Sequence, residues 1–368
     1  MKTKILRNIF ISVGVLFVSA RLLTAGTSDQ VPNFNDMPLG SAPPVIMTFE
    51  APGAGTGPMQ GTIAQAINQA GKIVGYFFTP SPVTRGFVRD PDGITFHEFD
   101  APGGGTGPYQ GTFVTAIDDA AGAITGFVRD SSDAFHGYER MPDGTFIGPF
   151  DARDAGTGRF QGTEPSNINA TGVITGTYVD PSNVNHGFVR DADGTIHEFD
   201  ALGAGTGPGQ GTGTGGVDCL TDAGATVGEY LDSSNVWHGF LRDPDGTIHE
   251  FDAPGAGTGP HQGTEPGGIN AAGTIIVLLI DMNDVTHGAE RAPDGTFAPP
   301  FDAPGAGTGP GQGTFPENIN ASGAITGWYI DSSNVNHGFL RASDGTITTF
   351  DAWSLATQSQ KCLLRCQI

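Results

Sequence analysis

One position of a repeating sequence carries histidine five times, and a ring of imidazoles could bind a metal ion or an anionic ligand. Each of these histidines follows an Asp by six residues, and in the first copy Arg85 follows Thr79 at the same distance. A group that every copy carries is more simply explained by a contact that every copy needs, such as a hydrogen bond to a turn carbonyl. We favour this structural interpretation. The candidate binding residues are His136, His186, His238, His287, His337 and Arg85.

Asp-rich turns suggest a second kind of site, for calcium. In "RDADGTIHEFD", Asp191, Asp193 and Asp200 stand at the third, fifth and twelfth places of a calcium-loop pattern. The first place is Val189, which cannot ligate, so we favour a hairpin turn. So acidic a chain still allows weak calcium binding. We predict no cofactor and no metal site, since the two thiols of "KCLLRCQI" are too few ligands.

The glycine-rich stretch "FDAPGAGTGPGQGT" (residues 301–314) looks like a phosphate-binding loop. Its glycines are spaced G-x-G-x-G, no Lys-Ser/Thr follows, and "TFPENINASG" places a proline where a helix should begin. The stretch also recurs, beginning at Phe49, Phe99, Phe150, Phe199 and Phe251. We therefore predict a structural connector, not a nucleotide site.

Catalysis needs a local set of residues, so departures from the repeat are where an active site should be sought. The main departures are Asp218-Cys219-Leu220, Trp237, Arg85, His261 and the apolar run from Thr274 to Ile280. None forms a recognisable Ser/His/Asp or Cys/His set. No catalytic residue is predicted.

These residues belong to six units with a period of 49 to 52 residues, ending at Phe350. Segments such as "GVITGTYVD" and "HGFVRD" are typical of short β-strands, and no helical periodicity follows the N-terminus. An Asp-Gly pair in every unit predicts a two-residue hairpin. The chain is predicted to be an all-β propeller, with six blades of four antiparallel strands from six repeats of ~50 residues. The glycine-rich connectors would cross from the outer edge of one blade to the inner edge of the next.

Two details bear on ring assembly. Units two and five resemble each other, as do three and six, which indicates a duplicated three-unit block and predicts that blades two and five face each other. The segment from Val45 to Ala51 adds a seventh candidate outer strand. Either this segment or the strand ending at Phe350 is expected to complete the last blade.

The N-terminus predicts export. Lys2, Lys4 and Arg7 precede a short apolar run, as in a secretory signal peptide cleaved after Ala20 or near Ala25. We divide the chain into a signal peptide (1–25), a linker (26–44), the propeller (45–352) and a non-repeat tail (353–368). Membrane contact is expected only through an uncleaved signal. The net charge of −22 disfavours nucleic acid as a partner, and three cysteines do not form a disulfide framework.

The combination "IN-x-x-G-x-I-x-G" followed by "H-G-F" resembles the HAF-type repeat family of predicted extracellular bacterial proteins, over roughly residues 49 to 351. These units carry Gly where that family usually has Ala, and "FDAPGAGTGPxQGT" replaces a shorter link. The resemblance implies an exported repeat protein and lends nothing to catalysis.

We therefore expect a secreted module that binds or scaffolds an extracellular or cell-surface ligand, glycans included, and that is more simply a binding protein than an enzyme. The alternative is a propeller enzyme, a lyase or a glycan hydrolase, with its site at the channel mouth. A local catalytic set among the irregular residues would favour the alternative.

Overall fold

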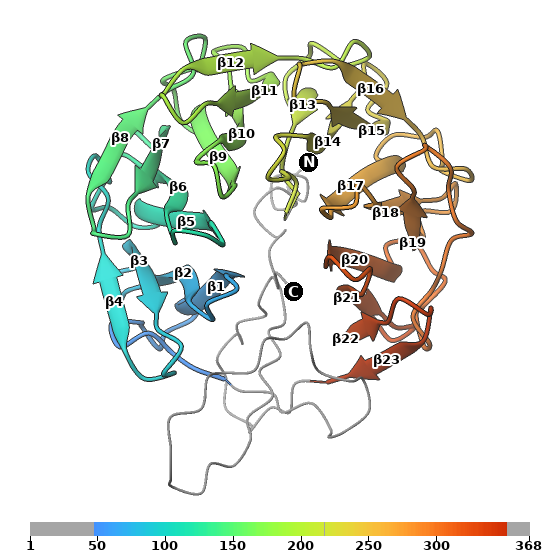
Figure 1. Cartoon of the computed structure of the whole chain (residues 1–368), viewed down its shortest axis with the longest axis horizontal. Helices are drawn as coiled ribbons and strands as arrows, with labels where there is room; N and C mark the ends of the chain where they lie inside the picture. Colours follow the sequence, from blue (N-terminus) through green and yellow to red (C-terminus); the bar gives the residue numbers. More distant parts are fainter. Residues whose placement is uncertain (1–47, 217, 352–368) are drawn as a thin grey trace, which may run out of the picture.

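The computed structural model describes residues 48–216 and 218–351, and its regular elements are 23 β-strands. Strand pairing divides them into six sets, here called blades one to six, which follow one another around a ring with the first strand of each set innermost (Figure 1). Figure 1 places blades two and five on opposite sides. The predicted all-β class is confirmed. No helix in the described part of the chain is long and apolar enough to cross a membrane.

Blade one contains β1 (Gly61–Ile67), β2 (Ile73–Phe78), β3 (Thr84–Arg89) and β4 (Phe96–Phe99). Blade two contains β5 (Gly111–Ile117), β6 (Ile124–Arg129), β7 (Phe135–Arg140) and β8 (Phe146–Phe150). Blade three contains β9 (Gly162–Ile168), β10 (Ile174–Val179), β11 (Asn185–Arg190) and β12 (Ile196–Phe199).

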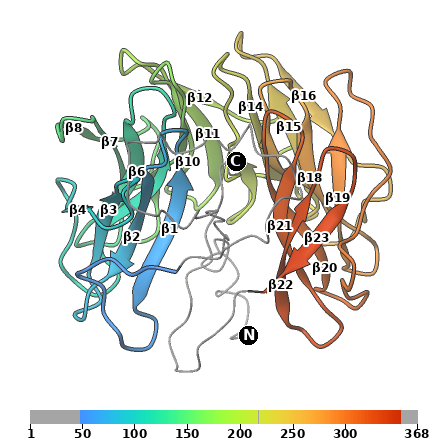
Figure 2. The same cartoon turned by 60° about the horizontal axis from the view of Figure 1, so that its bottom comes forward.

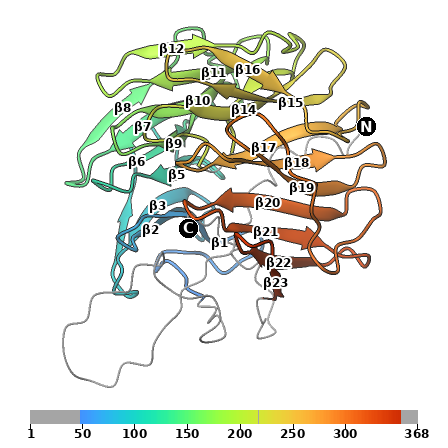
Figure 3. The same cartoon turned by 45° about the vertical axis from the view of Figure 1, so that its right-hand side comes forward.

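Blade four contains β13 (Gly211–Gly213), β14 (Thr226–Leu231), β15 (Trp237–Arg242) and β16 (Ile248–Phe251). Blade five contains β17 (Gly263–Ile269), β18 (Ile275–Ile280) and β19 (Thr286–Arg291). Blade six contains β20 (Gly313–Ile319), β21 (Ile325–Ile330), β22 (Asn336–Arg341) and β23 (Ile347–Phe350). Turned views show the strands of each blade side by side around the ring (Figures 2 and 3).

The hairpin turns of a blade share one geometry. In the turn after β11, Gly194 N–H donates to the Asp191 carbonyl and Asp191 N–H donates to the Thr195 carbonyl. Three residues therefore lie inside the turn, and only Gly194 needs a positive φ (93°). The predicted two-residue hairpin is wrong, because the Asp-Gly pair is followed by a threonine that closes a longer turn. Before β11, Asn183 takes the same place with a φ of 62°.

Neighbouring blades are joined through the third strand. Its first residue pairs in parallel with the Gly that opens the next blade: Thr84 with Gly111, Phe135 with Gly162, Asn185 with Gly211, Trp237 with Gly263 and Thr286 with Gly313. A Cβ on Gly111 would lie 2.2 Å from the Thr84 carbonyl oxygen, so this close approach requires glycine. Among the described residues, no equivalent pair joins Asn336 of blade six to Gly61 of blade one.

An arginine at the end of each third strand stacks on a phenylalanine of the preceding unit, which is a second interblade contact. The guanidinium of Arg242 lies 5.0 Å from the centre of the Phe199 ring. The equivalent pairs are Arg89 on Phe49, Arg140 on Phe99, Arg190 on Phe150, Arg291 on Phe251 and Arg341 on Phe301, at 4.6 to 4.8 Å. These pairs explain why the Phe of the connector recurs in every unit.

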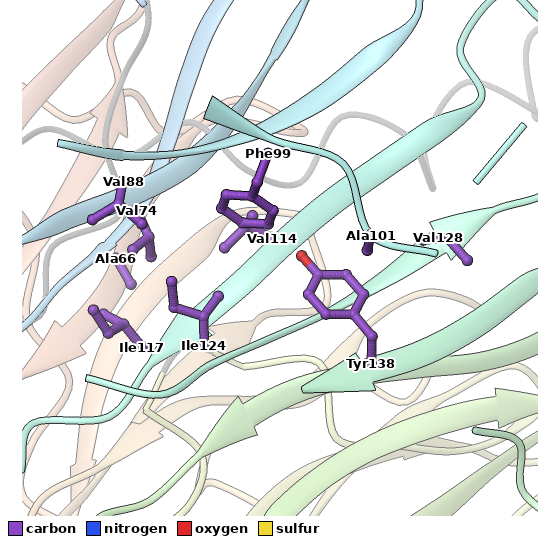
Figure 4. Close-up of a cluster of buried hydrophobic side chains, with 10 residues drawn as sticks. All are labelled: Ala66, Val74, Val88, Phe99, Ala101, Val114, Ile117, Ile124, Val128 and Tyr138. Atoms are coloured by element: carbon purple, nitrogen blue, oxygen red, sulfur yellow. The ribbon is translucent and has the colours of Figure 1, made fainter. Parts of the chain in front are cut away.

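Apolar side chains fill the spaces between blades. Figure 4 shows the cluster between blades one and two, where Val74, Val88 and Phe99 meet Val114 and Tyr138. The buried residues of this cluster are at most 7% exposed. Blades one to five each bury a face of their sheet against the following blade, which is how short strands form a stable core.

The glycine-rich connectors lie between blades, as predicted. Polar residues that recur in every copy, the Gln and Thr of Gln-Gly-Thr, hold each connector in place by hydrogen bonds. In the connector to blade two, the Ala101 N–H donates a buried hydrogen bond to Thr112 Oγ1, at 2.8 Å. Gln110 Oε1 accepts from Gly107 N–H, and its amide donates to the turn at Ser131. The residue just before this Gln, here called the rim position, is exposed and has a positive φ in all six units: Met59, Tyr109, Phe160, Gly209, His261 and Gly311.

The ends of the propeller and blade five depart from the expected pattern. Strand β23 pairs with β22 and so completes blade six, whereas Phe49 packs on Phe87 and Phe96 without forming a strand. In blade five the outer strand is reduced to two isolated bridges, because Pro299 and Pro300 have no N–H to donate. The signal peptide, the linker, residues 45–47, Cys362 and Cys366 lie outside the described residues.

Candidate functional site: an aromatic strip

Each histidine of the predicted set lies between two carboxylates, not against a turn carbonyl. In blade three, Nδ1 of His186 is 2.9 Å from Asp200 and Nε2 is 3.8 Å from Asp180. The other pairs of acids are Asp151 and Asp130 for His136, Asp252 and Asp232 for His238, Asp302 and Asp281 for His287, and Asp351 and Asp331 for His337. Arg85 bonds Asp100 and Glu98 in their place. Both ring nitrogens therefore face acids of the same blade.

The charge state of these rings follows from that geometry. The hydrogen bond to Asp200 raises the pKa of His186 above its usual value. For His337, burial opposes the charge, but Asp351 and Asp331 outweigh it and the pKa is also raised. His186 stacks on Tyr178, with ring centres 4.8 Å apart. The five histidines lie on the third strands of blades two to six, each bonded to acids of its own blade.

The remaining sequence candidates are likewise engaged in local contacts. Asp193 accepts a hydrogen bond from the Thr195 N–H, and the Asp191 carboxylate contacts His197. The two carboxylates of the suspected calcium loop are therefore bonded within their own hairpin. Cys219 is buried, with Sγ 3.5 Å from the Thr214 carbonyl oxygen. No group of three or more His, Cys, Asp or Glu suited to a metal ion occurs in residues 48–216 and 218–351. Whether so acidic a chain binds calcium weakly is left to experiment.

A continuous row of aromatic rings crosses blades one and two and ends at the connector to blade three. Neighbouring ring centres are 4.9 to 6.2 Å apart, the range of favourable ring contacts. Tyr109 and Phe160, at rim positions, are 37% and 41% exposed, and no ring of the row is fully buried. We call it the aromatic strip; in order of contact it consists of Tyr109, Phe78, Tyr76, Phe113, Phe127, Phe135 and Phe160.

The fold does not need aromatic residues at these places. Thr177, Glu229 and Leu278 take the position of Tyr76 and Phe127 in blades three to five. Those blades still make the same parallel pair with their successors. Blade six carries a single stacked pair at these places, Phe315 and Trp328, with ring centres 4.0 Å apart. An aromatic row that blades three to five do without points to a role beyond packing.

Charged groups flank the aromatic strip. The guanidinium groups of Arg129 and Arg159 lie 4.7 and 4.6 Å from the centre of the Phe160 ring, and both bond Asp133. The hydrogen bond from the Gln110 side chain is the main cause that lowers the pKa of Asp133, and the positive charges of Arg129 and Arg159 lower it further. Glu164 of blade three takes the position that Phe113 has in blade two. Burial raises the pKa of Glu164 to about 7.

Our reading of the sequence missed this strip, because its rings come from separate segments. A signal was present. Aligning the units on Gln-Gly-Thr shows that the rim position reads Met, Tyr, Phe, Gly, His, Gly while its neighbours hardly change. The residue after Thr varies in the same way, as Ile63, Phe113, Glu164, Gly213, Glu265 and Phe315. Side chains that vary within a constant frame are candidates for recognition.

No family model matches the chain, and no curated protein matches it. Among solved structures, the BP39L lectin from Burkholderia pseudomallei is similar with a TM-score of 0.48 and 10% identity, covering 79% of this chain and 84% of the lectin. A mutant of Aleuria aurantia lectin in complex with alpha-methyl-L-fucoside has a TM-score of 0.41 and 13% identity, covering 82% and 96%. A puromycin hydrolase mutant has a TM-score of 0.44 and 12% identity, covering 82% of this chain and 55% of the hydrolase. At these scores the similarities assign neither ligand nor activity to this chain.

Proposed function

We propose that the chain is an exported six-bladed propeller that binds a carbohydrate along the aromatic strip. The aromatic strip carries the proposal, since its rings are partly exposed and the fold does not require them. Export rests on the positively charged and apolar N-terminus. An extracellular or cell-surface glycan is the ligand class that we infer.

The chemistry of a sugar matches what the strip offers. One face of a pyranose ring presents C–H groups that pack on an aromatic face, while its hydroxyls need hydrogen-bonding partners. Tyr109 and Tyr76 add hydroxyls, Arg129 and Arg159 add N–H donors beside Phe160, and Glu164 of the next blade adds a carboxyl group. Arg129 also donates to the Tyr109 carbonyl oxygen, so both ends of the row of ring contacts lie near this arginine. Apolar surface with a few polar groups is the usual composition of a small-molecule site.

The test is a glycan binding screen followed by calorimetry with the best hit. We expect Tyr109→Ala and Phe160→Ala to weaken binding roughly tenfold or more, because each removes a ring at an exposed end. His261→Ala is the matched control, since it changes the same rim position in unit five, outside the strip. Unchanged affinity in both strip variants, or equal loss in the control, would refute the proposed site.

One observation favours the enzymatic alternative. Glu164, with its pKa raised to about 7, has a value suited to a general acid in glycan cleavage. Glu164→Gln tests this role: loss of glycan cleavage with binding retained would support a hydrolase or lyase. Binding without turnover by the unmodified protein would favour the binding module.

A further inference from the structure

The boundary between blades six and one, here called the seam, lacks a bond that joins the other blades (Figure 1). At each of the other five boundaries, the N–H that opens a third strand donates to the Gln carbonyl of the next connector, as Thr84 does to Gln110. The equivalent residues of the seam are Asn336 and Gln60, and no such bond joins them in the described chain. Val335, beside Asn336, is 49% exposed, whereas its counterparts in blades two to five are at most 6% exposed. Blade one therefore does not cover blade six as the other blades cover their predecessors.

The seam also has two phenylalanines where every other boundary has one. Phe99 makes two contacts at the boundary of blades one and two: its backbone pairs with β3, and its ring carries the guanidinium of Arg140 from blade two. At the seam these contacts are divided, because Phe350 pairs with β22 whereas Phe49 stacks on Arg89 of blade one. While both rings stay in these places, blade one cannot approach blade six as closely as neighbouring blades approach elsewhere.

The acids that follow these two phenylalanines show the same duplication. In every blade an acid at this place bonds the His or Arg of the third strand, and in blade six Asp351 bonds His337. Glu50, which follows Phe49, is exposed and contacts no positively charged group among the described residues.

The sequences of the two segments match over their whole length. Aligning Val45–Glu50 with Thr346–Asp351 places identical residues opposite each other at three positions: Ile46 with Ile347, Thr48 with Thr349 and Phe49 with Phe350. Ile347 packs on the core of blade six, so Ile46 has the side chain needed for the same place. The chain therefore carries a second copy of its last strand.

We propose that the segment Val45–Glu50 exchanges with β23 and closes the ring. In the closed state Phe49 keeps its stack on Arg89 and also pairs with β22, and Glu50 bonds His337. Blade one then covers Val335, and β23 leaves blade six together with the chain that follows it. One strand replaces another of matching sequence, so the strand pairing of blade six is kept, which is the condition for two packings of similar free energy.

Disulfide trapping in the full chain tests the closed state. By the alignment, Met47 matches Thr348, which pairs with Leu340 of β22. We expect Met47→Cys combined with Leu340→Cys to form a disulfide within one molecule under mild oxidation, because paired residues of adjacent strands lie within disulfide reach. Cys362 and Cys366 are changed to serine in every variant.

Two controls accompany this variant. Thr348→Cys with Leu340→Cys reports the strand pair seen in the structure, and Met37→Cys with Leu340→Cys reports chance contact from the same N-terminal segment. The Met47 variant should cross-link roughly tenfold faster than the Met37 variant, or more. Equal rates, or no disulfide from Met47 while the Thr348 control forms one, would overturn the proposal. A disulfide between two molecules would overturn it as well, because the seam would then belong to a second copy of the chain.

A second test measures stability and needs no cysteine. If either segment can fill the place beside β22, each compensates in part for damage to the other. Phe49→Ala combined with Phe350→Ala should then lower the melting temperature by more than the sum of the single variants. Phe99→Ala combined with Phe199→Ala is the matched control, whose losses should add, because each ring serves its own boundary. Additive losses for Phe49 and Phe350 would refute the exchange, and neither test depends on glycan binding at the aromatic strip.

Discussion

Replacing the glycine of "HGF" by alanine tests how tightly the blades are packed. A Cβ on Gly187 would lie 2.4 Å from an edge carbon of the Phe199 ring, whereas carbon atoms normally approach to ~3.5 Å or more. The ring must move by about 1 Å, and it cannot do so freely, because Arg242 of the next blade stacks on it.

The expected cost has two parts. Overpacking costs ~1–3 kcal/mol, and loss of the stacked guanidinium adds ~0.5–2 kcal/mol. We expect Gly187→Ala to lower the free energy of unfolding by about 1.5–5 kcal/mol and the melting temperature by about 3–10 °C. Calorimetry and urea unfolding provide the measurement.

A double variant separates a steric clash from a backbone effect. If the ring causes the strain, Gly187→Ala combined with Phe199→Leu should be less destabilised than the sum of the single variants, by about 1 kcal/mol or more. Additive losses would place the cost in the backbone. A melting temperature unchanged by Gly187→Ala would refute the packing argument altogether.

The remaining predictions concern the histidines, the connectors and calcium. Folding raises the pKa of His186, so the protonated ring should stabilise the protein fully below the unfolded pKa of about 6.5, and this contribution should be lost as the pH rises through the folded pKa. His186→Ala should therefore lower the free energy of unfolding more at about pH 5.5 than at about pH 8.5. The reverse order in urea unfolding would contradict the ion-pair geometry. Gly307→Val should lower the melting temperature, because a Cβ there meets Gln312 and the backbone of Asp331. Millimolar ATP or NAD should raise the melting temperature of neither the unmodified protein nor the variant. A nucleotide-dependent rise in the unmodified protein alone would restore the phosphate-loop interpretation. Calcium should leave the melting temperature unchanged, since Asp191 and Asp193 are bonded within their turn; a clear rise would show a site that the geometry does not reveal.

The repeat made the strands predictable, because segments such as Ile174–Val179 and Asn185–Arg190 recur with the same alternation in each unit. Local exceptions were harder. Blade five loses its outer strand at Pro299 and Pro300, although the residues flanking them follow the pattern. The turn type was missed because Gly194 alone takes a positive φ, and a dipeptide motif does not show which residue closes the turn.

Contacts between units were the least accessible to sequence reasoning. Arg242 and Phe199 recur at constant positions, yet nothing in either segment shows that one stacks on the other across a blade boundary. The same holds for Phe78 and Tyr109, which meet only when the connector crosses from blade one to blade two. The histidines were placed on the correct strand, but their acidic partners come from a turn and from a connector that had been assigned other roles.

At the rim position the backbone N–H holds the connector in place, and the side chain is free to differ between units. The N–H of Tyr109 bonds the Pro82 carbonyl at 2.7 Å, and the N–H groups of Phe160, Gly209, His261 and Gly311 make the same bond to the preceding turn. Because this hydrogen bond uses only the main chain, a substitution at the rim position changes the exposed side chain and keeps the bond that holds the connector. A ring of such positions can diversify one copy at a time, so new specificities can arise by point mutation of a single repeat while the other five preserve the fold. The same property makes the protein a natural framework for combinatorial libraries randomised at six fixed points.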